Sequence, residues 1–174
     1  MKRKYFVKAV LFLVVTGFGI GTVDAQAKND SEKKVIADLQ SAFYMEKMLQ
    51  DKNYLFKAST YSSTYAGTRQ LAADEYDIQI KKDTVIVALP YFGQSFSAQT
   101  SRVGGEGIKF TTTKFDYSAV EEQKGGKWHV SIKPKDSREI QLLFLTIFTN
   151  GTAMLQVTST NREPMTYNGY VKSK

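Results

Sequence analysis

"EIQLLFLTIF", residues 139 to 148, is the most apolar strand-like stretch of the chain. Successive side chains of a strand point to opposite faces, so the stretch presents two sets of side chains. One face carries Ile140, Leu142 and Phe144, and the other carries Leu143, Leu145 and Ile147. A strand that is apolar on both faces must be covered on both. We therefore expect a β-core on one side of this strand and a helix on the other.

The expected cover is an amphipathic helix over residues 31–51. Its apolar residues recur at three- and four-residue steps, which is the period of a helix. Asp30 or Ser31 can cap its start, and Glu32 in the first turn suits the helix dipole. The apolar face comprises Val35, Leu39, Ala42 and Leu49, widened by Ile36 and Phe43. We expect this face to lie on the sheet, and residues 26–31 before it to be loose.

The rest of the chain alternates with a period of two. Glycine-containing turns are predicted at 124–127 and at Asn150-Gly151, and residues 60–73 are expected to form a loop. Strands are expected at 54–59, 76–81, 84–89, 108–112, 115–122, 128–133, 139–148, 153–158 and 165–172.

One helix followed by eight or nine short strands, without βαβ crossovers, indicates an antiparallel sheet. A long meander tends to close, because closure removes exposed edges. The predicted fold is mainly β (α+β): an antiparallel meander forming a barrel or strongly curved sheet, with one N-terminal amphipathic helix packed on it. If the barrel is open, 165–172 is the expected edge strand.

The first segment is typical of a secretory signal peptide. Lys2, Arg3, Lys4 and Lys8 precede an apolar run, and Ala25 and Ala27 offer cleavage points. The apolar run is short and glycine-rich for a membrane anchor. We expect cleavage near Ala25 or Ala27, residues 26–174 as one β-rich domain, and a soluble protein in the periplasm or secreted.

Composition limits the chemistry. The chain has no cysteine and one histidine, so a thiol nucleophile, a lipobox cysteine and a zinc site are not expected. His129 lies on the polar side of its strand, and no pair of carboxylates or serine marks a catalytic site. The net charge of +7 is not clustered as a nucleic-acid footprint requires. We predict no cofactor, no metal, no catalytic residue, no nucleic-acid partner and no transmembrane segment after cleavage.

The segment "LPYFGQSFSAQTSRVGGEGIKF", residues 89–110, is the candidate site. Pro90 should end a strand, and aromatic residues then enter an otherwise polar segment. Two interpretations stay open: the aromatics plug an open end of the barrel, or they line a mouth with the glycine loop as its flap. Aromatic side chains usually serve as core, which favours the first.

These residues carry a resemblance. The stretches "YDIQIKKDTVIVALPYFGQSFS", "GIKF" and "FTNGTAMLQVTSTNREPMTYNGYV" resemble the domain-of-unknown-function family 4251, small exported proteins common in Bacteroidetes. The resemblance implies export and an antiparallel β-rich domain, and no assigned activity. Gln94 stands where many relatives have arginine, and the lipobox cysteine of many relatives is missing. The motif positions here are Leu89, Pro90, Tyr91, Phe92, Gly93, Gly107, Phe110, Asn161, Arg162, Tyr167 and Gly169.

Three hypotheses for function follow. The first is a non-enzymatic envelope protein that binds a small apolar or amphipathic ligand, or an envelope protein partner, near 89–110. The second is a hydrolase acting on an envelope polymer or glycan. The third is a structural or inhibitory module that pairs through an edge strand. The candidate ligand-binding residues are Tyr91, Phe92, Gly93, Phe96, Gly107, Phe110, Arg162 and Tyr167. Arg162 is more simply a structural clamp, through its planar donor fork.

Overall fold

The computed structural model describes residues 24–64, 67–72, 75–94, 107–122 and 126–174, with side chains from residue 32 onward. The chain divides after Ile36 into two compact units. The second unit, residues 37–174, holds the whole sheet and the C-terminal part of the helix. Within the described part of the chain, no helix is long and apolar enough to span a membrane.

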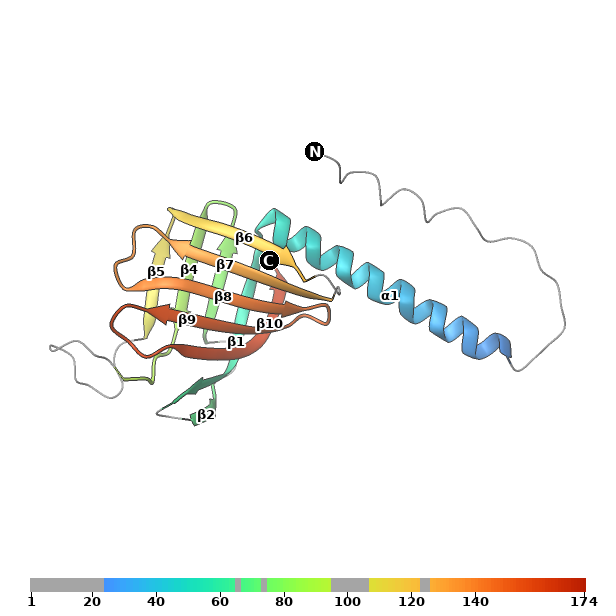
Figure 1. Ribbon diagram of the computed structural model, residues 1–174, viewed down its shortest axis with the longest axis horizontal. Helices are drawn as coiled ribbons and strands as arrows, with labels where there is room; N and C mark the ends of the chain where they lie inside the picture. Colours follow the sequence, from blue (N-terminus) through green and yellow to red (C-terminus); the bar gives the residue numbers. More distant parts are fainter. Residues whose placement is uncertain (1–23, 65–66, 73–74, 95–106, 123–125) are drawn as a thin grey trace. The chain divides into compact units, whose positions relative to one another are not determined.

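The described residues form one helix and ten strands, and their arrangement is seen in Figure 1. The helix begins at Asp24, so residues 26–31 are helical rather than loose. The predicted strands are all present, and one strand that sequence periodicity missed, β2, lies within the expected loop 60–73. The elements are α1 (Asp24–Asp51), β1 (Tyr54–Ser63), β2 (Gly67–Gln70), β3 (Asp77–Lys81), β4 (Thr84–Leu89), β5 (Ile108–Thr112), β6 (Phe115–Glu121), β7 (Lys127–Pro134), β8 (Ile140–Phe148), β9 (Thr152–Ser159) and β10 (Met165–Ser173).

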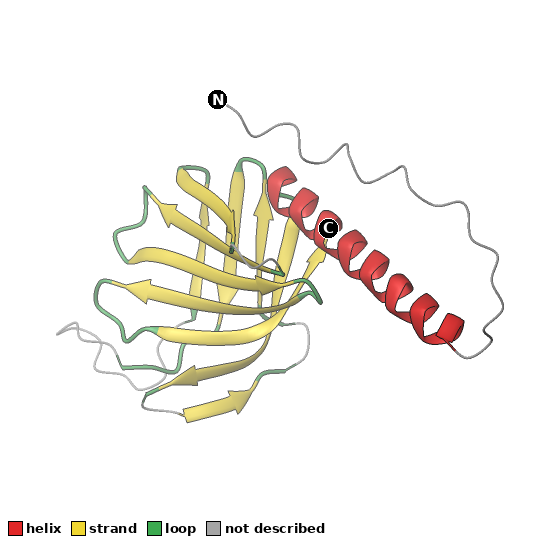
Figure 2. Cartoon of the chain, turned by 45° about the vertical axis from the view of Figure 1, so that its right-hand side comes forward, coloured by secondary structure: helices red, strands yellow, loops and turns green. Residues whose placement is uncertain are grey.

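The strands form a single antiparallel sheet in the order β5-β4-β3-β1-β10-β9-β8-β7-β6, with β2 paired to β1. The sheet curls until β6 to β9 cross in front of β3 to β5, giving a nearly closed barrel (Figures 1 and 2). The pairing of β1 with β10 includes a bulge in β1 between Ala58 and Thr60. A bulge bends the strand that contains it. The expectation that 165–172 forms the edge is wrong, because β10 lies between β1 and β9. The two ends of the strand order are β5 and β6, and β2 is a third edge because it pairs with β1 alone.

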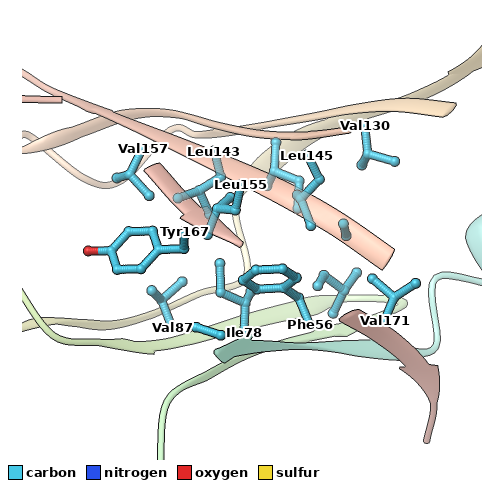
Figure 3. Close-up of a cluster of buried hydrophobic side chains, with 14 of the residues drawn as sticks. Phe56, Ile78, Val87, Val130, Leu143, Leu145, Leu155, Val157, Tyr167 and Val171 are labelled. Carbon is cyan, nitrogen blue, oxygen red and sulfur yellow. The ribbon is translucent and has the colours of Figure 1, made fainter. Parts of the chain in front are cut away.

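The interior is filled by apolar side chains from opposing strands. In Figure 3, residues of β7, β8 and β9 point toward residues of β1, β3 and β4. On β8, Leu143, Leu145 and Ile147 are fully buried. On its other face, Leu142 and Phe144 stay half-buried. The helix does not seal that face as expected; instead Phe144 stacks on His129 of β7, with ring centroids 5.5 Å apart.

The helix packs on the sheet through its last turns. Met45, Met48 and Leu49 are buried in the core, and Ala42 is partly buried against it. The predicted apolar face is otherwise wrong: Leu39 and Phe43 are 63% and 67% exposed, and Val35 and Ile36 are exposed as well. Every side chain from Ala37 to Ser41 is exposed, so this part of the helix meets the barrel only from Ala42 onward. Phe43 lies on the side of the helix away from Met45.

A tyrosine pair fixes the end of the helix. Tyr117 of β6 donates to the carbonyl oxygen of Leu49 at 3.0 Å, and its hydroxyl lies 3.2 Å from that of Tyr54. Lys52 follows the helix in the left-handed conformation, with φ 51°, and its ammonium lies 5.0 Å from the centre of the Tyr117 ring. A carbonyl group in the last helical turn and the barrel wall are thereby joined by the Tyr117 side chain.

The buried tyrosines predict loss of stability in alkali. Burial raises the pKa of Tyr117 to about 12 and raises the pKa of Tyr54 and of Tyr167 well above the usual value. The neutral phenols are favoured in the fold, so their contribution is present below the ordinary pKa of about 10 and is lost as pH rises toward 12 and beyond. We expect tyrosinate absorbance in the near ultraviolet to appear in two phases, the second coinciding with unfolding by circular dichroism. Complete ionisation of all ten tyrosines in a folded protein near pH 10 would contradict this.

The turn at Asn150-Gly151 differs in detail from the predicted tight hairpin. The connection between β8 and β9 has three residues, and only Gly151 adopts a positive φ, of 83°. Asn150 instead uses its side-chain oxygen to accept hydrogen bonds from the Thr152 amide and hydroxyl, at 3.0 and 2.7 Å. This is the three-residue hairpin in which the last loop residue is left-handed.

Candidate functional site

Two motif tyrosines lie where β4 ends. Tyr167 of β10 is fully buried and donates to the carbonyl oxygen of Pro90 at 2.6 Å. Tyr91 is 3% exposed, and its hydroxyl donates to the carbonyl oxygens of Gln94 and Glu163, at 2.6 and 3.3 Å. Burial raises the pKa of Tyr91, so the phenol stays a donor. The motif "LPYFG" is therefore held to the β9–β10 connection by hydrogen bonds to backbone carbonyl groups.

Glu163 joins three segments that are distant in sequence. Its carboxylate accepts from the amide of Thr64 at 2.7 Å and from the amide of Gln94 at 3.2 Å. Its own amide donates to the carbonyl oxygen of Gln94 at 2.9 Å. Thr64 follows β1, Gln94 follows β4, and Glu163 precedes β10. We name the set Thr64, Tyr91, Gln94, Arg162, Glu163 and Tyr167 the loop junction.

Arg162 contacts two residues of its own chain. Its guanidinium lies 4.9 Å from the centre of the Tyr91 ring, and its Nε forms an ion pair with Glu139 just before β8. Both contacts are made within the chain. The contacts place Arg162 as a support for Tyr91, with 22% of its side chain exposed.

Phe92 is the exposed aromatic residue of the region. Its side chain is 37% exposed, and its ring stacks on that of Tyr61 in β1, with centroids 4.4 Å apart and planes 19° from parallel. Tyr61 itself is buried. Because the neighbouring residues Tyr91 and Gln94 are held by the loop junction, Phe92 is presented to solvent in a fixed orientation.

The remaining candidates serve the packing of the chain. A Cβ on Gly93 would lie 2.6 Å from the Tyr91 hydroxyl oxygen, and one on Gly107 would overlap the carbonyl oxygen of Leu89. Phe110 pairs with Val87 and is partly buried against the core. Phe96 lies outside the described residues. Tyr91, Phe92, Gly93, Arg162 and Tyr167 thus come together. Phe110 belongs to the β4–β5 pairing, and Gly107 lies just before β5, close to Leu89 of β4.

Sequence reasoning missed Glu163, Tyr61 and Thr64. Glu163 follows the motif residue Arg162 in a turn. This neighbouring position was the only sequence signal that could have pointed to Glu163 as a site residue. Tyr61 and Thr64 belong to the region expected to be a loop, where β1 in fact continues to Ser63. Nothing in the local sequence shows that Tyr61 stacks on Phe92 or that Thr64 donates to Glu163. Thr64 and Glu163 are 99 residues apart in the sequence.

His129 does not form a catalytic triad in the described residues. Its Nε2 lies 3.5 Å from Glu122, its Nδ1 lies 3.5 Å from the Thr146 hydroxyl, and its ring stacks on Phe144. Asp136, a possible triad partner, accepts a hydrogen bond from Thr112 at 2.6 Å. In the part of the chain that the structure describes, no three histidine or acidic side chains gather as metal ligands would.

The molecule is a small antiparallel barrel whose loops are joined by buried tyrosines and a glutamate. A family model described as a domain of unknown function, DUF4251, matches residues 37–171, and the chain belongs to that family. The chain is also similar to the crystal structure of a DUF4251 family protein from Bacteroides eggerthii DSM 20697. The TM-score is 0.59 at 16% identity, over 79% of this chain and 91% of that chain. No curated protein matches.

Proposed function

We propose that this chain is an exported, non-enzymatic binding domain of the bacterial envelope. Its ligand is apolar or amphipathic and lies on the exposed ring of Phe92, which stacks on the buried Tyr61. The observation that carries the proposal is that Phe92 is exposed while its ring stacks on Tyr61. Aromatic side chains supply large contact area, and fixing them before binding lowers the entropic cost of association.

The barrel interior supports a surface site rather than an internal one. Phe56, Ile78, Leu143, Leu145 and Leu155, which face one another across the barrel, are all fully buried. Because side chains fill the interior of the barrel, we expect the ligand to bind at the loops.

The surroundings of Phe92 suit an amphipathic molecule. Apolar groups of the ligand would contact the ring, and polar groups would meet the exposed side chains of Thr64 and Gln94. The Glu163 carboxylate already accepts two amide hydrogen bonds, so its role is to hold this surface in shape. The export signal at residues 1–25 supports a location where lipids, bile acids and glycans are available.

The test compares two exposed phenylalanines. The purified protein is heated with a panel of lipids, bile acids and envelope glycans, and we expect one class to raise the melting temperature. Phe92→Ala should weaken binding of that class at least tenfold, because burying an aromatic ring contributes roughly 1.5–3 kcal/mol. Phe148→Ala, on β8 and 41% exposed, should bind as the wild type does. A panel in which no ligand shifts melting, or equal losses in both variants, would contradict the proposal.

A further inference from the structure

The strand β6 is a free edge of the sheet. Within the described residues it pairs with β7 alone. From Ser118 to Glu121 every side chain is exposed, including Val120 at 58%. The helix contacts β6 through the phenol of Tyr117, on a face of the strand rather than along its edge.

This edge has few of the devices that usually prevent pairing. Native edges carry charged residues, above all lysine, or proline or a bulge, or are very short or covered. The charges of β6 are the acidic Asp116 and Glu121. Residues 115–121 contain neither lysine nor proline, and their seven pairs with β7 run without a register shift. The edge β5 has five residues and carries Lys109, and β2, which pairs with β1 alone, has four residues and carries Arg69. Of the described edges, β6 is the one that can accept another strand.

Two hydrogen bonds establish which backbone groups of β6 face outward. The amide of Glu122 donates to the carbonyl oxygen of Lys127, and the carbonyl oxygen of Lys114 accepts from the amide of Lys135. Residues 114 and 122 therefore face β7, and so do 116, 118 and 120, because direction alternates along an antiparallel strand. The N–H and C=O groups of 115, 117, 119 and 121 point away from β7.

We infer that two copies of this chain pair through β6, antiparallel, about a two-fold axis at Ser118. Tyr117 then lies opposite Ala119 of the second copy, so that outward donors meet outward acceptors. Lys114 lies opposite Glu122 at both ends of the pairing, and no like charges face each other. Moving the axis to Ala119 would set Asp116 against Glu122, which is unfavourable for directly opposed like charges. A second copy is thus complementary in charge to this edge, and the opposition of Lys114 to Glu122 favours this register over the neighbouring ones, which do not pair these two residues.

Proline at position 119 tests the pairing without breaking the chain's own sheet. Ala119→Pro removes an outward N–H and leaves the bonds to β7, as proline is tolerated at edges with that orientation. By light scattering with size-exclusion chromatography, we expect the wild type to shift from monomer to dimer with concentration. Ala119→Pro should stay monomeric with an unchanged melting temperature, and Ala119→Ser should dimerise normally. A wild type that stays monomeric, or a dimer that persists in Ala119→Pro, overturns the inference.

The register has a separate test. Lys114→Glu and Glu122→Lys should each weaken dimerisation roughly tenfold, by placing like charges opposite each other at two symmetric positions. The double variant Lys114→Glu/Glu122→Lys should recover wild-type dimerisation. Glu122 also forms an ion pair with Lys127 of its own chain, with an N–O distance of 2.5 Å. Both Glu122→Lys and the double variant lose this ion pair, so these two variants are compared with each other. Equal weakening in the double variant would exclude this register. Both tests are independent of ligand binding at Phe92.

Discussion

Gly169→Ala is expected to prevent stable folding. Gly169 lies in β10 opposite Ala58 of β1. A Cβ at this position would overlap the carbonyl oxygen of Lys57, and its next neighbours are also backbone atoms, Lys57 C and Ala58 Cα, at 2.9 and 3.1 Å. Backbone cannot move aside as a flexible side chain can, so β1 and β10 must separate at the central pair of the sheet. We expect a loss of at least about 4 kcal/mol, the size that marks a named structural defect.

Gly67→Ala is the matched control for this change. Gly67 has a φ of 64°, and nothing lies within 4 Å of its Cβ position. Its replacement should cost only the left-handed backbone strain, about 1–2 kcal/mol. Soluble yield under identical expression, followed by urea unfolding where protein is obtained, separates the two variants. A Gly169→Ala protein as stable as Gly67→Ala would show that β1 and β10 do not approach as closely as described.

Glu163→Ala is expected to produce the second-largest loss, because one side chain holds the loops after β1 and β4. Hydrogen bonds to a charged group contribute about 1.5–3 kcal/mol each. Thr64 and Gln94 are exposed, so water replaces part of the loss. We expect a decrease of about 2–3 kcal/mol in the free energy of unfolding, and about half of that for Glu163→Gln, which keeps one acceptor oxygen.

Amide hydrogen exchange identifies the cause of that decrease. The amides of Thr64 and Gln94 should exchange faster in Glu163→Ala, under conditions where the strand amides remain protected. Glu46→Ala is the control, since Glu46 is exposed and accepts one hydrogen bond, from Gln50 at 2.9 Å. Unchanged exchange at Thr64 and Gln94 would mean that the carboxylate does not hold these loops.

Local periodicity was enough to predict the elements. The helix, the strands from β3 to β10 and the antiparallel arrangement follow from the alternation of side chains, which is a property of neighbouring residues. The missed strand β2 is entirely exposed. It has no apolar alternation to reveal it, because it pairs only with the end of β1.

Tertiary contacts decided the rest. The sequence by itself determined a curled antiparallel sheet with a leading helix, and it marked the motif residues that form much of the loop junction. Only the fold decided that the helix uses Met45 and Leu49 rather than Leu39 and Phe43, that β6 rather than β10 is an edge, and that Glu163 meets Thr64. The physical reason is that periodicity records whether a side chain is apolar, whereas its partner depends on which distant strands lie beside it.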